Sequence, residues 1–163
     1  RILYLRRRTL IQFEKIMKKF AFLLALLITL PTFAQKADDL VGVWFNEEKD
    51  GKVEVYKKAD GKYYGKIVWV KNDFNDDGSK PKRDRKNPDE KLRSRQVNGL
   101  VVLTSLKWDA NDKEWEGGQI YDTKSGKTYS CYCKLQPDGS LFFKGYVLGM
   151  TFLGRSTVWT RAK

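Results

Sequence analysis

Four oxygen-bearing side chains in one polar segment have the spacing of a cation-binding loop. Asp73, Asn75 and Asp77 alternate along the chain, Gly78 stands at the sixth position, and Asp84 falls at the twelfth. Oxygen ligands at alternate residues, with a glycine at the sixth position, can wrap a hard cation such as calcium. Basic residues surround the segment and no helical pattern flanks it, so an ordinary Asp- and Asn-rich turn is the competing interpretation.

Catalytic residues are harder to find. The chain of 163 residues contains no histidine, which removes the commonest general base and metal ligand. Carboxylate pairs or a Ser–Lys pair remain formal candidates, but there is no strand–turn–helix nucleophile motif. The sequence therefore favours a protein that is not an enzyme.

Short apolar or alternating runs, rich in Val, Tyr, Phe and Trp, follow one another from residue 42 onward. Turn residues such as Asp-Gly close each run, and no helical period is sustained over several turns. The predicted strands are 42–45, 53–58, 63–70, 100–109, 114–122, 127–136, 140–147 and 152–161. Sequential hairpins of this number predict an all-β fold, a single eight-stranded antiparallel up-and-down barrel.

Alternation along these strands predicts which side chains face the barrel interior, because charged residues should point outward. The inward positions include Tyr63, Trp69, Gln119, Tyr121 and Phe143. Arg155 has the same parity as Arg161, so both should point the same way. An inward Arg155 can bind a carboxylate or phosphate headgroup while the aromatic residues cover an apolar tail. The alternatives are pairing of Arg155 inside the protein, its exposure beyond a bulge, or a barrel filled by its own side chains.

The segment before the barrel has the three parts of a secretory signal. Met17, Lys18 and Lys19 form a basic start, residues 20–30 are apolar, and residues 32–34 place small side chains where a signal peptidase reads. We expect residues 17–34 to be a signal peptide, residues 1–16 an upstream translation artefact, and residues 35–163 the mature domain, periplasmic or secreted. The apolar run is about half of the roughly 20 residues that cross a bilayer, so no transmembrane anchor is expected after cleavage.

The net charge depends on this cleavage. Residues 1–34 contain seven basic residues and one acidic residue, so the formal charge of +12 falls to +6 in the mature chain. A nucleic-acid partner is therefore not expected. The long loop at 71–98 is basic and can attract envelope lipid or glycan, although Asp84, Asp89 and Glu90 interleave with its bases and favour pairing within the loop.

Cys131 and Cys133 are separated by one residue in a predicted strand. Their side chains then lean toward the same face but stand too far apart for relaxed disulfide geometry. We expect two buried free thiols.

A series of short motifs runs along nearly the whole mature chain. They are Gly42-Val43-Trp44, Gly65-Lys66-Ile67-Val68-Trp69, residues 77–81 with Asp84 and Asn87-Pro88, residues 92–95, 118–122, 126–129, 145–147, 153–155 and 159–161. Together they resemble the domain of unknown function 2147 family. Members of that family are small exported bacterial proteins with a lipocalin-like, calycin-type barrel. The resemblance implies this fold and compartment, and it implies no settled activity.

Gly42 and Trp44 on the first strand, with Trp159 and Arg161 on the last, also resemble the lipocalin barrel closure. There, an arginine of the final strand lies over the first-strand tryptophan. A guanidinium over an indole contributes roughly 0.5–2 kcal/mol, depending on its desolvation. We expect a structural role for these residues.

The sequence as a whole predicts an exported, lipocalin-like binding protein for a small apolar or amphipathic ligand, with no cofactor unless the loop binds calcium. The alternative is a ligand-free cell-envelope interaction module that acts through the 71–98 loop, stiffened by calcium.

Overall fold

The computed structural model describes residues 17, 35–147 and 150–162. The predicted artefact (1–16) and nearly all of the predicted signal peptide (17–34) lie outside the described residues, so both stay predictions. Within the described part of the chain, no helix has the length and apolar character needed to cross a membrane.

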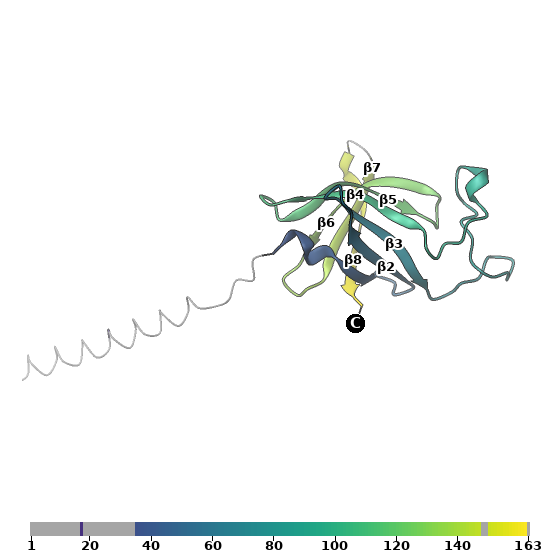
Figure 1. Ribbon diagram of the computed structural model, residues 1–163, viewed down its shortest axis with the longest axis horizontal. Coiled ribbons are helices and arrows are strands. Elements are labelled where there is room, and N and C mark those ends of the chain that lie inside the picture. The colour runs from purple at the N-terminus through teal and green to yellow at the C-terminus, as the bar shows by residue number, and fades with distance from the viewer. Residues whose placement is uncertain (1–16, 18–34, 148–149, 163) are drawn as a thin grey trace, which may run out of the picture. The chain divides into compact units, whose positions relative to one another are not determined.

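The described chain folds as a closed barrel of eight antiparallel strands, each paired with its neighbours in sequence (Figure 1). The strands are β1 (Gly42–Phe45), β2 (Gly51–Lys57), β3 (Tyr63–Val70), β4 (Val101–Asp109), β5 (Glu114–Asp122), β6 (Lys127–Leu135), β7 (Leu141–Val147) and β8 (Met150–Arg161). Two short 3-10 helices accompany them, η1 (Ala37–Leu40) before β1 and η2 (Glu90–Leu92) in the long connection between β3 and β4. The predicted all-β, eight-stranded antiparallel up-and-down barrel is confirmed.

The up-and-down order divides the connections between the two ends of the barrel. Residues 46–50, 71–100 and 123–126 lie at the end where β1, β3 and β5 finish, and residues 58–62, 110–113 and 136–140 lie at the other end. Helix η1 precedes the start of β1, so it belongs to the second end.

Helix η1 fills this second end of the barrel. Leu40 is fully buried, and the indole of Trp44 donates a hydrogen bond to its carbonyl oxygen at 2.9 Å. The indole of Trp115 donates to the carbonyl oxygen of Ala37, also at 2.9 Å, and its ring meets Tyr63 edge-on with centroids 6.4 Å apart. Buried indole N–H groups need such partners, so the two tryptophans fix η1 across the barrel.

The seam of the barrel is the pairing of β1 with β8, where Trp44 lies opposite Arg161. The Arg161 guanidinium lies 4.2 Å from the Trp44 ring centroid and donates to the carbonyl oxygens of Val41 at 3.0 Å and Asp39 at 2.6 Å. A Cβ at Gly42 would lie 2.5 Å from the same guanidinium. Gly42, Trp44 and Arg161 thus lie together, as in the expected closure, whereas Trp159 packs elsewhere.

A β-bulge in β3 reverses the alternation at its end. Trp69 pairs with Lys52, whereas Ile67 pairs with Val53, so Val68 is an extra residue in the ladder. Ile67 faces the interior and Trp69 turns outward, with 37% of its surface exposed. The prediction that Trp69 lies inside is wrong, because a bulge shifts every later side chain to the opposite face.

A second bulge lies in β5. Gly117 has a φ of 67°, and the pairing register shifts between Trp115 and Gly118. Beyond the bulge Ile120 points inward and Gln119 is exposed. The inward position predicted for Gln119 is therefore wrong for the same reason.

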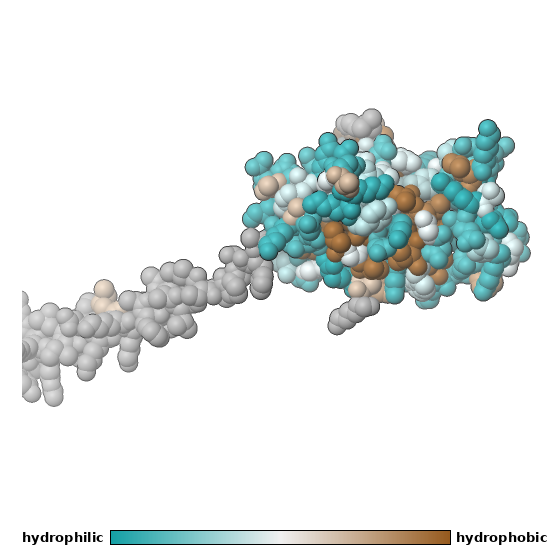
Figure 2. Space-filling view, viewed as in Figure 1, coloured by the Kyte–Doolittle hydropathy of each residue, from teal (hydrophilic) through white to brown (hydrophobic). Residues whose placement is uncertain are grey.

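The barrel surface is mostly hydrophilic, and hydrophobic residues gather toward the middle of the face seen in Figure 2. Among the large hydrophobic side chains, Phe152 is the most exposed, at 77% of its surface. Cys131 and Cys133 are buried free thiols in β6.

Candidate functional site

A cavity of about 720 Å³ occupies the end of the barrel opposite η1. Phe143 and Trp159 form its floor, since their rings stack with centroids 4.8 Å apart and an interplanar angle of 9°. Both side chains are nearly fully buried. This stacked pair separates the hollow half of the barrel from the half that is filled by Trp44, Tyr63 and Trp115.

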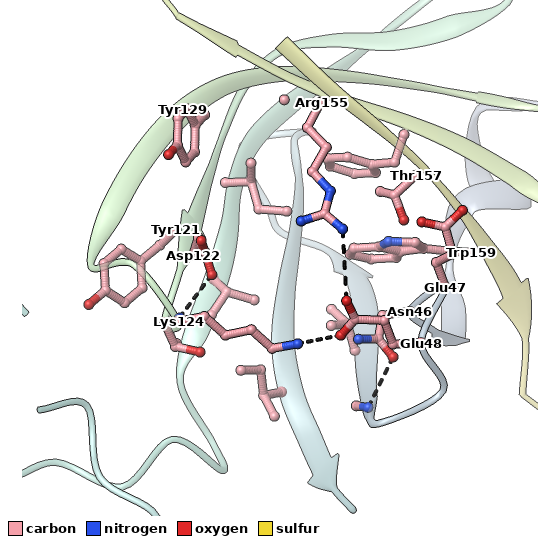
Figure 3. A pocket seen from close by; sticks show the side chains of 18 of the residues that line it. Asn46, Glu47, Glu48, Tyr121, Asp122, Lys124, Tyr129, Arg155, Thr157 and Trp159 are labelled. Atoms are coloured by element: carbon pink, nitrogen blue, oxygen red, sulfur yellow. Dashed lines mark hydrogen bonds and ion pairs between the residues drawn. The ribbon is translucent and has the colours of Figure 1, made fainter. Parts of the chain in front are cut away.

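The walls above this floor are largely aliphatic. They are formed by Val53, Ile67, Val70, Val97, Val102, Ile120, Val147 and Leu153. Val97 comes from the end of the long β3–β4 loop and is 3% exposed, so this loop closes part of the cavity. Tyr129 and Thr157 add polar groups between the walls and the mouth (Figure 3). Such an apolar chamber can hold a molecule with a sizeable hydrocarbon part.

Charged side chains surround the mouth of the cavity. Four of the lining residues are acidic and four are basic, namely Glu47, Glu48, Asp50 and Asp122 against Lys52, Lys82, Lys124 and Arg155. The Lys52 ammonium, however, lies over the outward-facing rings of Phe45 and Trp69, 4.7 and 5.5 Å from their centroids, so it does not neutralise the mouth.

Glu48 lies between two of these cations (Figure 3). One of its oxygens accepts a hydrogen bond from the Lys124 ammonium, and the other lies 3.8 Å from the Arg155 guanidinium. Lys124 also contacts Asp50 at 3.1 Å. The mouth is thus crossed by ion pairs that join the β1–β2 turn to the β5–β6 turn and to β8.

These contacts shift the pKa values of two of the groups, Lys124 and Asp50, toward the charged form. The hydrogen bond to Glu48 raises the pKa of Lys124 above its ordinary value, against an opposing effect of partial burial. Partial burial works against ionisation of Asp50, but hydrogen bonds from Asn46 and Lys124 outweigh it and lower the pKa of Asp50. Both shifts favour the charged forms of Lys124 and Asp50.

Residues 42–161 match the family described as "Uncharacterized protein conserved in bacteria (DUF2147)". The chain belongs to this family. It is also similar to a solved structure described as "Protein HP1028 from the human pathogen Helicobacter pylori belongs to the lipocalin family". The two chains are 29% identical, with a TM-score of 0.63, over 76% of this chain and 83% of the other. No curated protein matches the chain.

The predicted ligand-binding residues fall into four groups in this DUF2147 barrel. Arg155 and Phe143 line the cavity, at its mouth and floor. Tyr121 lies at the rim, but its hydroxyl donates to Asp84 at 2.6 Å. Burial and this hydrogen bond raise the pKa of Tyr121. Trp69 and Gln119 point outward beyond their bulges.

Tyr63 is inside the barrel but not in the cavity. It is 1% exposed, and its hydroxyl donates to Asp38 of η1 at 2.6 Å. The expectation that Tyr63 covers a ligand tail is wrong, because the residue belongs to the filled end.

The sequence interpretation missed Glu48, Lys124 and Ile120. Glu48 and Lys124 lie in hairpin turns, and the predicted strand order alone places both turns at the same barrel end. That topological signal was present in the sequence. Ile120 was hidden by the bulge at Gly117.

The candidate calcium ligands are engaged in separate hydrogen bonds. Asp73 accepts from the amide of Lys82 at 2.9 Å, and the Asn75 amide group donates to the carbonyl oxygen of Ser79 at 2.9 Å. Asp77 accepts from the amide of Ser79 at 3.0 Å and from its hydroxyl. These bonds, together with Arg85, lower the pKa of Asp77 to about 2. The three side chains act as turn-stabilising groups.

The fourth candidate, Asp84, is fully buried and anchors the loop. It accepts hydrogen bonds from Arg95 at 3.0 and 2.8 Å, from Asn87 at 2.9 Å and from Tyr121 at 2.6 Å. No group of three or more Asp, Glu, Cys or His residues in the described chain is placed to hold a metal ion. The expected calcium site at Asp73, Asn75, Asp77 and Asp84 is therefore not formed.

Proposed function

We propose that this protein binds a small apolar or amphipathic molecule inside the barrel. The observation that carries the proposal is the cavity of about 720 Å³ above the Phe143–Trp159 floor. Its volume falls within the range of roughly 300–1,000 Å³ that is usual for ligand sites. Aliphatic walls and a charged mouth suit a molecule with an apolar body and a polar end.

The fold supports the same proposal. The similar Helicobacter pylori protein is described as a lipocalin, and the mouths of β-barrels are among the places where small-molecule sites recur. We further propose that binding takes place outside the cytoplasm, in the periplasm or the medium, on the basis of the signal-like pattern in residues 17–34.

The test uses the uncharged fluorescent probe N-phenyl-1-naphthylamine. We expect its fluorescence to rise on binding to the wild-type protein and to stay at the background level with Ile120→Trp, which fills the cavity. Gln119→Trp is the matched control, because the neighbouring residue points outward on the same strand. Thr157→Leu provides a second, milder filling variant, and melting temperatures show whether each variant is folded.

Two further results bear on the proposal. Native mass spectrometry of protein purified from its own host should detect a bound small molecule that solvent extraction releases. If the wild-type protein does not bind the probe and carries no extractable molecule, the cavity is not a ligand site and the proposal is wrong.

A second candidate function uses the 71–98 loop to contact envelope lipid or glycan. The observation that favours it is the anchored loop, since the buried Asp84 gives the segment one defined arrangement, and long loops in compact domains are often functional. We expect binding to vesicles that contain lipopolysaccharide, and a loss of binding when the exposed Lys80, Lys86 and Lys91 are replaced by Gln. Equal binding before and after the replacement would contradict this function.

A further inference from the structure

The Arg155 guanidinium lies at the mouth of the cavity, and most of its N–H donors have no partner within the described residues. Its side chain is 83% exposed, and its one ion pair in the described chain is with Glu48 at 3.8 Å. That separation exceeds a hydrogen bond, and the Arg155 guanidinium has no hydrogen-bond partner among the described residues. A guanidinium can donate two parallel hydrogen bonds to a carboxylate or phosphate. Arg155 is therefore available to an anion.

The position of Arg155 on β8 determines where the rest of an anionic ligand would lie. Arg155, Thr157 and Trp159 share one face of the strand, and all three line the cavity. Along a strand, Arg155 and Trp159 are roughly 13 Å apart. A molecule whose anionic end meets Arg155 can thus lay its apolar part along Thr157 toward the Phe143–Trp159 floor.

Glu48 occupies the place where that anionic end would bind. It lies between Lys124 and Arg155. An anion bound beside Glu48 would add a further negative charge to two cations that already contact Glu48 and Asp50, whereas an anion that replaces Glu48 leaves the charge of the mouth unchanged. Lys124 retains Asp50 at 3.1 Å when Glu48 leaves, so the exchange does not leave the lysine without a carboxylate.

From these contacts we infer that the ligand is an amphiphile with a carboxylate or phosphate headgroup, and that Glu48 is its internal competitor. The headgroup binds Arg155 and Lys124 and displaces the Glu48 side chain, which releases the β1–β2 turn from Arg155 on β8 while Asp50 still joins that turn to Lys124. This inference rests on the proposed function, and it adds the sign of the ligand's charge and a residue that limits its affinity.

The experiment measures displacement of N-phenyl-1-naphthylamine by two probes of equal chain length, dodecanoate and 1-dodecanol. Both are used below their aggregation limits and at constant ionic strength. We expect wild-type protein to prefer dodecanoate by about tenfold, since a charge-assisted hydrogen bond adds about this much. Arg155→Gln should abolish the preference by weakening dodecanoate binding far more than dodecanol binding, since only the carboxylate forms a charge-assisted pair with the guanidinium.

Glu48→Gln tests the competitor. We expect it to bind dodecanoate several-fold more tightly than the wild type, with dodecanol unchanged. Glu116→Gln is the matched control, because it removes the same charge from an exposed position on β5 outside the cavity. An equal gain in Glu116→Gln would show a general charge effect and overturn the role of Glu48.

The outcomes separate the two proposals. If dodecanoate and dodecanol displace the dye equally and Glu48→Gln changes neither, the inference is wrong while the proposed function stands. If the dye itself does not bind, both fall. Melting temperatures of Arg155→Gln and Glu48→Gln near the wild-type value are expected, since both side chains are largely exposed or half exposed.

Discussion

Replacing Asp84 by alanine should destabilise the barrel more than any other single change in the long β3–β4 loop. The carboxylate has no exposed surface and is the shared acceptor for three side chains, Arg95, Asn87 and Tyr121. Asp84→Ala removes all of these bonds at once. The loss also releases the loop from β5, because Tyr121 belongs to that strand.

The expected loss of unfolding free energy depends on the groups that lose their partner when the Asp84 carboxylate is removed. Breaking a buried ion pair by removing one partner costs about 3–5 kcal/mol. Here the Arg95 side chain is 38% exposed and can recover part of its hydration, so we expect about 3 kcal/mol. Asp84→Asn keeps the shape and one acceptor oxygen but not the charge, and should lose about half as much.

Urea denaturation followed by tryptophan fluorescence measures this loss, and a thermal scan should show a fall of roughly 10 °C for Asp84→Ala. Asp77→Ala is the matched control, because Asp77 pairs with Arg85 in the same loop at 51% side-chain exposure. We expect a much smaller loss there. Equal losses in the two alanine variants would refute the assignment of Asp84 as the loop's anchor.

Three further predictions concern the barrel itself. Gly118→Ala should destabilise by roughly 1–3 kcal/mol in urea, because the added Cβ would lie 2.7 Å from Leu106; wild-type stability would contradict the close packing. Arg161→Lys should lose about 1–2 kcal/mol in the same assay, because lysine cannot both cover the Trp44 ring and bridge two carbonyl oxygens. Burial raises the pKa of Cys131 to about 12, so the thiol should resist iodoacetamide at pH 8 in the folded protein and react only after unfolding; rapid native labelling would show that it is accessible.

The strands could be predicted from the sequence because each has a local signal. Turn residues such as Pro137-Asp138-Gly139 separate runs of β-branched and aromatic residues, and every observed strand begins and ends within two residues of the prediction. The hairpin order then required an up-and-down barrel.

The faces of the strands could not be predicted throughout, because a bulge has no reliable signal in one sequence. The extra residue at Val68 and the positive φ of Gly117 each reversed the alternation, which moved Trp69 and Gln119 outward and Ile120 inward. Parity holds along β8, where Arg155, Thr157 and Trp159 share the cavity face.

The cavity itself depends on how side chains are distributed along the barrel axis, which alternation does not report. Tyr63 and Phe143 both point inward, yet one packs beside η1 and the other forms the cavity floor. The hydrogen bond from Tyr63 to Asp38 of η1 holds Tyr63 in the filled end of the barrel. It joins residues far apart in the sequence, so no local pattern reports it.

Both ends of the barrel chain emerge at the filled end. Helix η1 begins there at Ala37, and the amide of Ala162 donates to the carbonyl oxygen of Val43 at 2.8 Å. The mouth lies at the other end of the barrel, one strand's length away along its axis. Attachment of the barrel to a bead, a surface or a fusion partner through the chain before η1 or after β8 therefore takes place at the filled end. The mouth stays unobstructed, and a ligand can enter and leave while the protein is immobilised.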